Sequence, residues 1–194
     1  PPQSEKEKKL ALFRFNDNEL LMETARGVTD RLKKSRLLEE NNIKIHEKTA
    51  QNDFSTGQAI AQEIVQEKYD YIITVSTPAL QSMAQVNKVI PHVFGAVTDP
   101  YRMGVAKTPE KHQSNITGVA TCQPVEKTFE LMREIFPEAR KVGMIWNPSE
   151  ACSQVCTEKA RMAAKKYNFQ LLEVNVSGTA EVMDALNSLL NKNI

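Results

Sequence analysis

Short apolar segments alternate along the chain with longer segments that carry apolar residues at every third or fourth position. The short segments have the length and the bounding turn residues of β-strands, and the longer ones have the period of amphipathic helices. The predicted strands are residues 10–15, 43–49, 71–76, 92–97, 116–120, 142–146 and 169–176. The predicted helices are residues 18–34, 55–66, 78–86, 125–135, 149–167 and 180–190. This alternation predicts an α/β fold, with parallel sheets covered by helices on both faces.

Three of the predicted strand-to-helix connections are rich in Asn, Ser, Thr and acidic residues. They are residues 15–19, 76–78 and 146–150. Ligands of open parallel sheets bind outside the carboxyl ends of the strands, where helix N-termini present unpaired N–H groups and partial positive charge. These three corners are therefore the candidate binding site, and they suit a small zwitterion better than a phosphate.

Hydroxyl groups and acidic groups in these corners could bind the two charged ends of a zwitterion. Ser76 and Thr77 are the carboxylate candidates, because their hydroxyls and the N–H groups of the next turn converge there. The alternative is that one of them only caps the helix. Asp17, Asp99 or Glu150 could face an ammonium group, although each of these acids could also be solvated.

Two aromatic residues end predicted strands at matching positions. Phe15 and Trp146 could sandwich an apolar or aromatic ligand side chain, although Trp146, as the single tryptophan, is favoured as a core residue. Each is followed by an asparagine, Asn16 or Asn147, and then by a glutamate three residues later. This repeat suggests two similar lobes; the alternative is that two ordinary helix starts coincide.

The second of these corners has the sequence of a helix start. Asn147 would be the N-cap, Pro148 the first helical residue, and Glu150 could reach back as in a capping box. The segment 118–124 is the expected first crossing between lobes. The predicted organisation is therefore an N-terminal tether at 1–9, a first lobe at 10–120 and a second lobe at 121–194.

Composition narrows the class of partner. The chain has 194 residues, 41% of them hydrophobic, with a mean hydropathy of -0.43, which is enough for one large domain or two small lobes. It has 25 basic and 24 acidic residues and no basic run interleaved with aromatic residues, so a nucleic-acid partner is not expected. No apolar run approaches the roughly 20 residues of a membrane span.

Common catalytic and cofactor motifs are missing from the sequence. The seven glycines lie at least nine residues apart, so the sequence contains neither a G-x-G-x-x-G motif nor a P-loop. The three histidines are isolated, and no G-x-S-x-G motif occurs. Cys122, Cys152 and Cys156 are interpreted as structural thiols rather than as a zinc site. We therefore expect no enzyme, cofactor or metal, although a nucleophile assembled from distant segments stays open.

Several longer segments resemble a known family. VSTPALQSMA, HVFGAVTDP, NITGVATCQPVEKTFELM, FPEARKVGMIWNPSEA and VSGTAEVMDALNSLL follow one another as in the substrate-binding proteins of ABC transporters, of the kind linked to tryptophan and other aromatic amino acids. The resemblance runs from about Lys9 to the end of the chain, and TDP, NITGV and NPSEA are its most specific motifs. Cys152 is a departure, because many relatives have Asn at this position.

The resemblance implies a type I periplasmic-binding-protein fold: two doubly wound lobes, a hinge that closes, and a ligand held in the cleft between the lobes. The second lobe would be incomplete in this chain. The ligand-facing positions that the resemblance implies are those already selected on physical grounds. They are Phe15, Asn16, Asp17, Ser76, Thr77, Asp99 and the corner from Asn147 through Ser149 to Glu150, beside Trp146.

The function implied by the resemblance is that of an extracytoplasmic carrier. It would deliver a small ligand, an aromatic or other amino acid, to a membrane ABC permease. Such a protein would lie in the periplasm or be lipid-anchored at the outer face of the membrane, with its signal peptide removed. Two alternatives stay open: the ligand-sensing domain of a signalling receptor, and an enzyme on a flavodoxin-like sheet.

Overall fold

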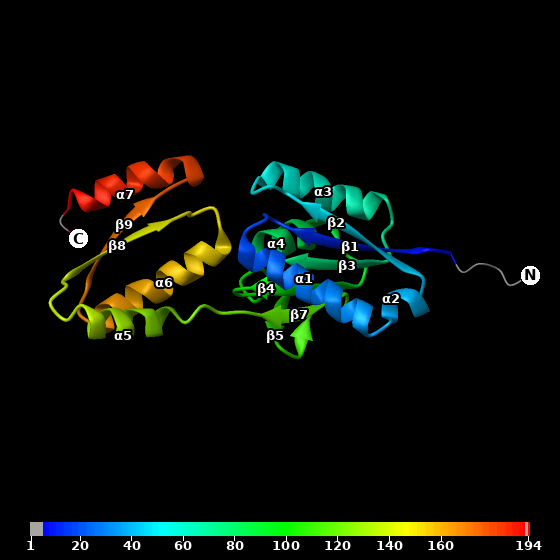
Figure 1. The fold of residues 1–194 in the computed structure, drawn as a ribbon, viewed down its shortest axis with the longest axis horizontal. Coiled ribbons are helices and arrows are strands. Elements are labelled where there is room, and N and C mark those ends of the chain that lie inside the picture. The colour runs from blue at the N-terminus through cyan, green and yellow to red at the C-terminus, as the bar shows by residue number, and fades with distance from the viewer. Residues whose placement is uncertain (1–5, 193) are drawn as a thin grey trace, which may run out of the picture. The chain divides into compact units, whose positions relative to one another are not determined.

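The computed structural model describes residues 6–192 and 194. Its internal contacts divide the chain into two compact units, Pro1–Thr121 and Cys122–Ile194, whereas the sequence placed the division one residue earlier. Each unit contains parallel strands and flanking helices, so the predicted α/β class is confirmed (Figure 1). No helix among the described residues is long and apolar enough to cross a membrane.

The first unit is built on a five-stranded parallel sheet with the strand order β2-β1-β3-β4-β7. Its strands are β1 (Lys8–Arg14), β2 (Ile43–Thr49), β3 (Tyr71–Val75), β4 (His92–Val97) and β7 (Ile116–Ala120). Its longer helices are α1 (Glu19–Lys34), α3 (Phe54–Gln66) and α4 (Thr77–Val86).

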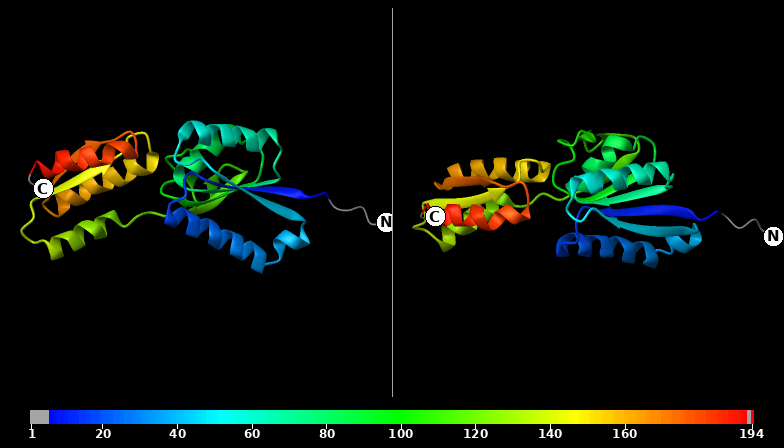
Figure 2. Two further views of the ribbon diagram at one scale, coloured as in Figure 1. Left: turned by 45° about the horizontal axis from the view of Figure 1, so that its top comes forward. Right: turned by 90° about the horizontal axis from the view of Figure 1, so that it is seen from above.

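Strand β1 shows why helices cover both faces of this sheet. Leu10 and Leu12 point to one face, where they pack with Leu21 of α1. Ala11 and Phe13 point to the opposite face and pack in a cluster with residues of α3 and α4. Because neighbouring side chains of a strand alternate between faces, the apolar run from Leu10 to Phe13 must be covered on both faces. Figure 2 shows the helices on either side of the strands.

The second unit contains the two parallel strands β8 (Lys141–Trp146) and β9 (Gln170–Asn175). Helices α5 (Val125–Ile135) and α6 (Ala151–Lys166) share an apolar cluster with these strands, centred on Phe129 and Phe169. Helix α7 (Val182–Leu190) approaches closely at Gly143, where an added Cβ would lie 3.1 Å from a methyl group of Leu189. The described part of this unit therefore has the two strand-helix repeats that the sequence predicted.

Several boundaries differ from the predictions. The N-terminal tether is shorter than expected, because Lys8 and Lys9 already pair with β2; residues 1–5 lie outside the described residues. Short elements were missed, because they carry no periodic apolar pattern. They are α2 (Leu37–Glu40), the hairpin of β5 (Ala106–Thr108) and β6 (Lys111–His112), and the 3-10 turn Thr179–Glu181.

The buried histidine of β4 predicts a pH-dependent stability. Only 1% of His92 is exposed, and burial lowers its pKa from 6.5 to about 4. Its Nε2 lies 2.8 Å from Thr74 Oγ1, whereas Nδ1 has no hydrogen-bond partner within the described residues. Between pH 6.5 and 4 the unfolded chain binds the proton more readily than the folded chain, so stability falls as the pH falls through this window. The full loss, reached below pH 4, is about 3 kcal/mol.

Urea unfolding at a series of pH values tests this prediction. In His92→Gln the free energy of unfolding should fall less between pH 6.5 and 4, and the difference from the wild type should approach the contribution of about 3 kcal/mol assigned to His92. The matched change His112→Gln, at an exposed position, should leave the pH profile of the wild type intact. An unchanged profile in His92→Gln would show that the pH dependence has another source.

Candidate functional site

The carboxyl ends of β1, β3 and β4 meet at one edge of the first sheet. The chain leaves β1 for α1 on one face, and it leaves the neighbouring strand β3 for α4 on the opposite face. Ligands of doubly wound sheets bind at such a switch point, because the two departing connections open a crevice beyond the strand ends. The structure thus brings the corners that carry Asn16, Asp17, Ser76, Thr77 and Asp99 to the same edge.

Ser76 adopts an unusual backbone conformation at this edge. Its φ of 111° and ψ of 157° lie in a region that L-residues rarely occupy, and such strain costs on the order of 1–3 kcal/mol. The Ser76 N–H donates to the carbonyl of Gly95 over 3.0 Å, and its Oγ accepts from the N–H of Ala79 over 3.3 Å. Strain of this kind concentrates at ligand sites. Ser76 therefore caps α4, as the alternative interpretation of the sequence predicted. Its strained backbone also keeps it a candidate ligand-binding residue.

Thr77 connects the corner after β3 to the corner after β4. Its Oγ1 accepts a hydrogen bond from the N–H of Thr98 over 3.1 Å, and the residue is buried. Both hydroxyls, those of Ser76 and Thr77, accept from backbone N–H groups, so each retains its own hydrogen to donate. The two side chains are therefore held in place and can still act as donors to a carboxylate.

The acidic residues of the first unit are also oriented by their own surroundings. Asp99 Oδ1 accepts from the N–H groups of Tyr101 and Arg102, over 3.0 and 3.1 Å. Asp17 Oδ1 lies 3.1 Å from Nη2 of Arg14. Asn16 accepts from the N–H of Asn18 through Oδ1, over 3.1 Å. These contacts fix the polar groups of the corners without the help of a ligand.

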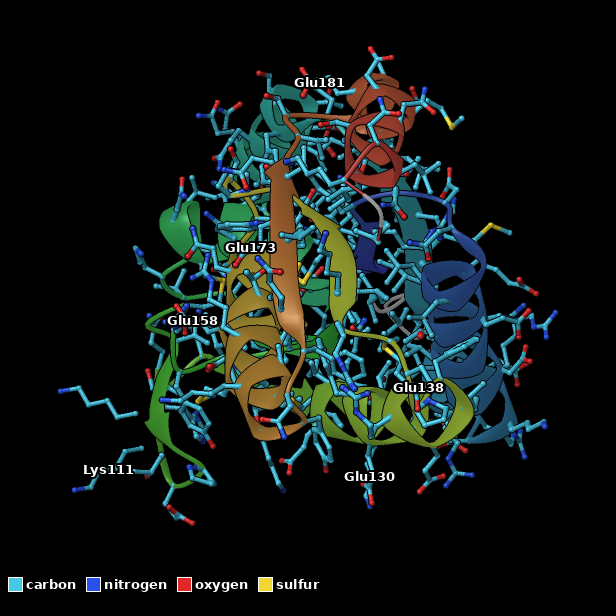
Figure 3. The ribbon with its side chains drawn as sticks, turned by 90° about the vertical axis from the view of Figure 1, so that its left-hand side faces the viewer. Lys111, Glu130, Glu138, Glu158, Glu173 and Glu181 are labelled. Carbon is cyan, nitrogen blue, oxygen red and sulfur yellow. The ribbon has the colours of Figure 1, made fainter. Side chains whose placement is uncertain are left out.

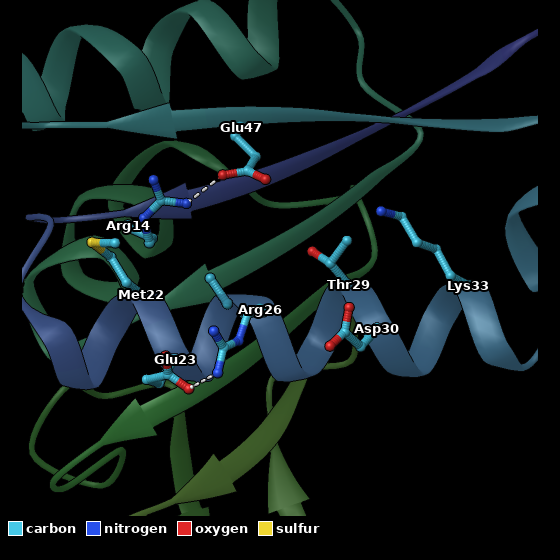
Figure 4. A pocket seen from close by; sticks show the side chains of 9 residues that line it. Arg14, Met22, Glu23, Arg26, Thr29, Asp30, Lys33 and Glu47 are labelled. Carbon is cyan, nitrogen blue, oxygen red and sulfur yellow. Dashed lines mark hydrogen bonds and ion pairs between the residues drawn. The ribbon is translucent and has the colours of Figure 1, made fainter.

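Arg14 links the first corner to a neighbouring pocket. Burial lowers the pKa of its guanidinium, but hydrogen bonds and attraction from Glu47 and Asp17 outweigh this effect, so its pKa is raised. Figure 4 shows the pocket of about 330 Å³ that Arg14 lines with α1 and Glu47. Its basic and acidic residues are equal in number, and both Arg14–Glu47 and Arg26–Glu23 are paired. We therefore assign no charged ligand to this pocket.

The structure corrects the predicted role of Phe15. The residue is 2% exposed, and its ring packs against Phe54 with the centroids 4.8 Å apart. A ring held in the core cannot form one wall of an aromatic sandwich. Tyr101, which the sequence pattern did not single out, is 46% exposed and directly follows the Asp99-Pro100 turn. An aromatic residue after a polar turn was the signal that could have identified it.

The predicted helix start in the second unit is also wrong. Helix α6 begins at Ala151 with Glu150 as its N-cap residue, and no side-chain bond caps it. Asn147 instead closes a tight turn, because its Oδ1 accepts from the N–H of Ser149 over 2.9 Å. Its Nδ2 donates to Glu150 Oε1 over 3.3 Å and to the carbonyl of Ser177 over 3.4 Å. Asn147 therefore ties together the segments that follow β8 and β9.

The two similar corners share one piece of local geometry. Asn16 and Asn147 each accept a hydrogen bond from the N–H group two residues later. Such a turn suits asparagine, because its side chain can bond to the nearby backbone. The corners differ at the helix start: α1 is capped by the Asn18 side chain, whereas α6 has no such cap.

Trp146 is partly buried at the end of β8. The Arg161 guanidinium lies 5.5 Å from the centre of its ring, and Arg161 also makes two hydrogen bonds of 2.8 Å with Glu173 of β9. Glu173 is labelled in Figure 3. Those bonds are the main reason that the pKa of Glu173 is lowered. The indole N–H is buried, and its interaction with Glu173 also helps to lower the pKa of that carboxyl group. The tryptophan is thus both a packing residue and part of the corner.

The described residues contain no cluster of three or more His, Cys, Asp or Glu side chains that could hold a metal ion. The groups gathered at the strand ends are hydroxyls, amides, single carboxylates and backbone N–H groups. Such a set can bind a small polar molecule by hydrogen bonding.

A doubly wound α/β chain with polar corners at its strand ends has the architecture of a type I periplasmic binding protein. The family model described as ABC transporter substrate binding protein matches residues 9–193, so the chain belongs to this family. The resemblance seen in the sequence is therefore confirmed.

Individual relatives agree with this assignment. A tyrosine-binding protein of Clostridioides difficile (strain R20291) is 34% identical over 189 residues, which cover 97% of this chain and 55% of that protein. The crystal structure of a conserved domain protein from Vibrio cholerae is 32% identical with a TM-score of 0.89, covering 96% of this chain and 63% of the other.

A further relative supports the fold. The ABC domain in complex with L-Trp from Streptococcus pneumonia is 24% identical with a TM-score of 0.90, again covering 96% of this chain and 63% of the other. The chain thus spans from 55% to 63% of the length of these three relatives.

Two substitutions at Ser76 separate backbone strain from capping. In Ser76→Gly the unusual φ carries no steric cost, and glycine is a tolerated N-cap, so we expect a gain of about 1 kcal/mol in the free energy of unfolding. In Ser76→Ala the strain remains and the cap is lost, so we expect a loss of about 1 kcal/mol. Thermal or urea unfolding of the two variants measures the difference. If Ser76→Gly were less stable than Ser76→Ala, the backbone of Ser76 would not be strained as the structure indicates.

Proposed function

We propose that the protein is the ligand-binding part of an extracytoplasmic solute-binding protein, and that it delivers an amino acid with an aromatic side chain to an ABC permease. The single observation that carries this proposal is the convergence of Ser76, Thr77 and Asp99 at the switch point of the first sheet. The family assignment supports the carrier role over a receptor or an enzyme. The names of two relatives, which refer to tyrosine and to L-Trp, support the ligand class.

The chemistry of the first unit matches a zwitterionic ligand. The hydroxyls of Ser76 and Thr77 would donate to the α-carboxylate, which the positive end of α4 also favours. Asp99 would accept from the α-ammonium through its second carboxylate oxygen. Tyr101, exposed beside Asp99, would provide an aromatic surface for the ligand side chain. Asn16 and Asp17 would complete this edge.

The corner of the second unit carries polar groups of its own that could bind the same class of ligand. Ser149 is exposed, and Asn147 and Glu150 are partly buried and bonded to one another. A carboxylate and a hydroxyl in this arrangement can accept from an ammonium or a phenol hydroxyl and donate to a carboxylate. Trp146 would support this corner from the end of β8.

Location and partners follow from the carrier role. A protein that hands a solute to an importer acts on the outer side of the membrane, in the periplasm or held there by a lipid anchor. Its macromolecular partner would be the membrane permease, and a nucleic-acid partner is not proposed. The bound amino acid would be released unchanged, because capture and delivery require no chemical step.

A thermal-shift screen against the twenty amino acids tests the proposed function. A ligand that binds only the folded protein raises its stability by about 2.7 kcal/mol at one hundred times its dissociation constant. We expect the aromatic amino acids to raise the unfolding temperature most, and the others to raise it little.

The double variant Ser76→Ala/Thr77→Ala identifies the site in the same assay. It should remain folded and lose most of the ligand-induced shift, because two donors to the carboxylate are removed. The matched control is Ser35→Ala/Ser114→Ala, at positions in the connections that lead to the amino ends of β2 and β7. It should keep the wild-type shift. An equal loss in both variants, or no response of the wild type to any amino acid, would contradict the proposal.

A further inference from the structure

Two cysteines and a lysine lie together where the second unit begins. Cys122, the first residue of this unit, is exposed, and the Nζ of Lys159 donates to its sulfur. The adjacent residue Gln123 accepts from the sulfur of Cys156, with 3.7 Å between Sγ and Oε1. Residues 156 and 159 are three apart in α6 and therefore share a face of that helix. One face of α6 thus contacts both residues of the 122–123 segment.

We propose that Cys122 and Cys156 form a reactive thiol pair that closes reversibly into an intramolecular disulfide. From the sequence all three cysteines are interpreted as structural thiols, but the contacts with Lys159 and Gln123 distinguish Cys122 and Cys156 from Cys152. The inference rests on contacts within the second unit, so it does not depend on the proposed ligand.

The reaction is a thiol-disulfide exchange with a small disulfide such as oxidised glutathione. The ammonium of Lys159 donates to the Cys122 sulfur and holds it in place, and Cys122 reacts as the thiolate. Cys122 attacks one sulfur of the small disulfide, forms a mixed disulfide and releases the first thiol. Cys156 then loses its proton to solvent and attacks the Cys122 sulfur, which releases the second thiol. Two protein thiols are oxidised, and one small disulfide is reduced to two thiols.

The surroundings of Cys156 suit it to the second step of the reaction. Burial is the main cause that raises the pKa of Cys156, and the charge of Cys122 raises it further, against the opposing effect of Lys159. Cys156 would act second, as the resolving thiol, because its more exposed partner reacts first with the oxidant.

Cys152 provides a control within the same helix. It lies one turn before Cys156, and its sulfur faces Glu150 Oε2 at 3.7 Å. Burial, aided by the charge of Glu150, raises its pKa to about 11. A thiol that stays protonated at neutral pH is a poor nucleophile, so Cys152 should remain reduced.

The disulfide would restrain the connection between β7 and α5. Strand β7 ends at Ala120, and α5 begins at Val125. A bond from Cys122 to α6 would leave Thr121 as the single residue between the strand and the cross-link. The oxidation state of the pair would thus set how much of this connection can move.

Thiol counting and peptide mapping by mass spectrometry test the proposal. The reduced protein has three free thiols, and incubation with oxidised glutathione should leave one, with a Cys122–Cys156 linkage in the digest. Cys122→Ser and Cys156→Ser should each abolish that linkage, whereas Cys152→Ser should form it at the wild-type rate. Lys159→Met should slow the reaction about threefold to tenfold, and Lys159→Arg should restore much of the rate.

Each contrary result is equally clear. Oxidised protein that stops at a mixed disulfide on Cys122 would overturn the pairing, and so would a linkage that uses Cys152. A wild-type rate in Lys159→Met would overturn the role of the ammonium. Circular dichroism of the reduced variants shows that they are folded, so that a lost linkage reports the thiols themselves.

Discussion

The parallel pairing of β1 with both β2 and β3 is the constraint on which the first unit depends. Leu12 lies opposite Glu47 on one side and Ile73 on the other. A shift of one residue would exchange the two faces of β1 and place its leucines against the wrong helices. Because the strands run in one direction, this register also sets their carboxyl ends side by side. The polar corners are therefore neighbours as a consequence of the packing of the core.

The corners are organised before any ligand arrives. Asparagine turns at residues 16 and 147, and an aspartate turn at residue 99, hold the backbone by local hydrogen bonds. Ser76 stores strain at the junction of β3 and α4, and its N–H is held by the neighbouring strand. A site fixed in this way loses little conformational entropy on binding, so more of the contact energy is available for affinity.

The framework could be predicted from the sequence in unusual detail. The predicted bounds of β2, β4, β7 and α5 match the structure residue for residue, because apolar runs there end at clear turn residues. The error at α6 has a specific cause. Asn147 fits the sequence rule for an N-cap, but its side chain bonds to the N–H of Ser149 and delays the helix to Ala151. Two local bonding modes compete for one asparagine, and the sequence pattern is the same for both.

Other features depend on contacts between distant segments. The burial of Phe15 follows from its packing on Phe54, and the burial of His92 from its place in the sheet beside Thr74. Nothing local to either residue indicates its depth. The strand-end rule correctly predicts that the first-unit corners lie at one edge of the sheet, since it rests on topology rather than on single side chains. The proximity of Cys122 to α6 could not be predicted from the sequence, because it depends on the path that the chain takes between β7 and α5.

The most direct test of the central claim is a titration of the protein with L-tyrosine, followed by the backbone amide resonances in NMR. The account predicts that the largest shifts occur at the carboxyl-end corners, at Ser76, Thr77 and residues 99–101, and at residues 147–150. The amides along α1 beside the Arg14 pocket should change little. Shifts concentrated along α1, or at the amino ends of the strands, would contradict the claim that the switch-point corners form the binding site.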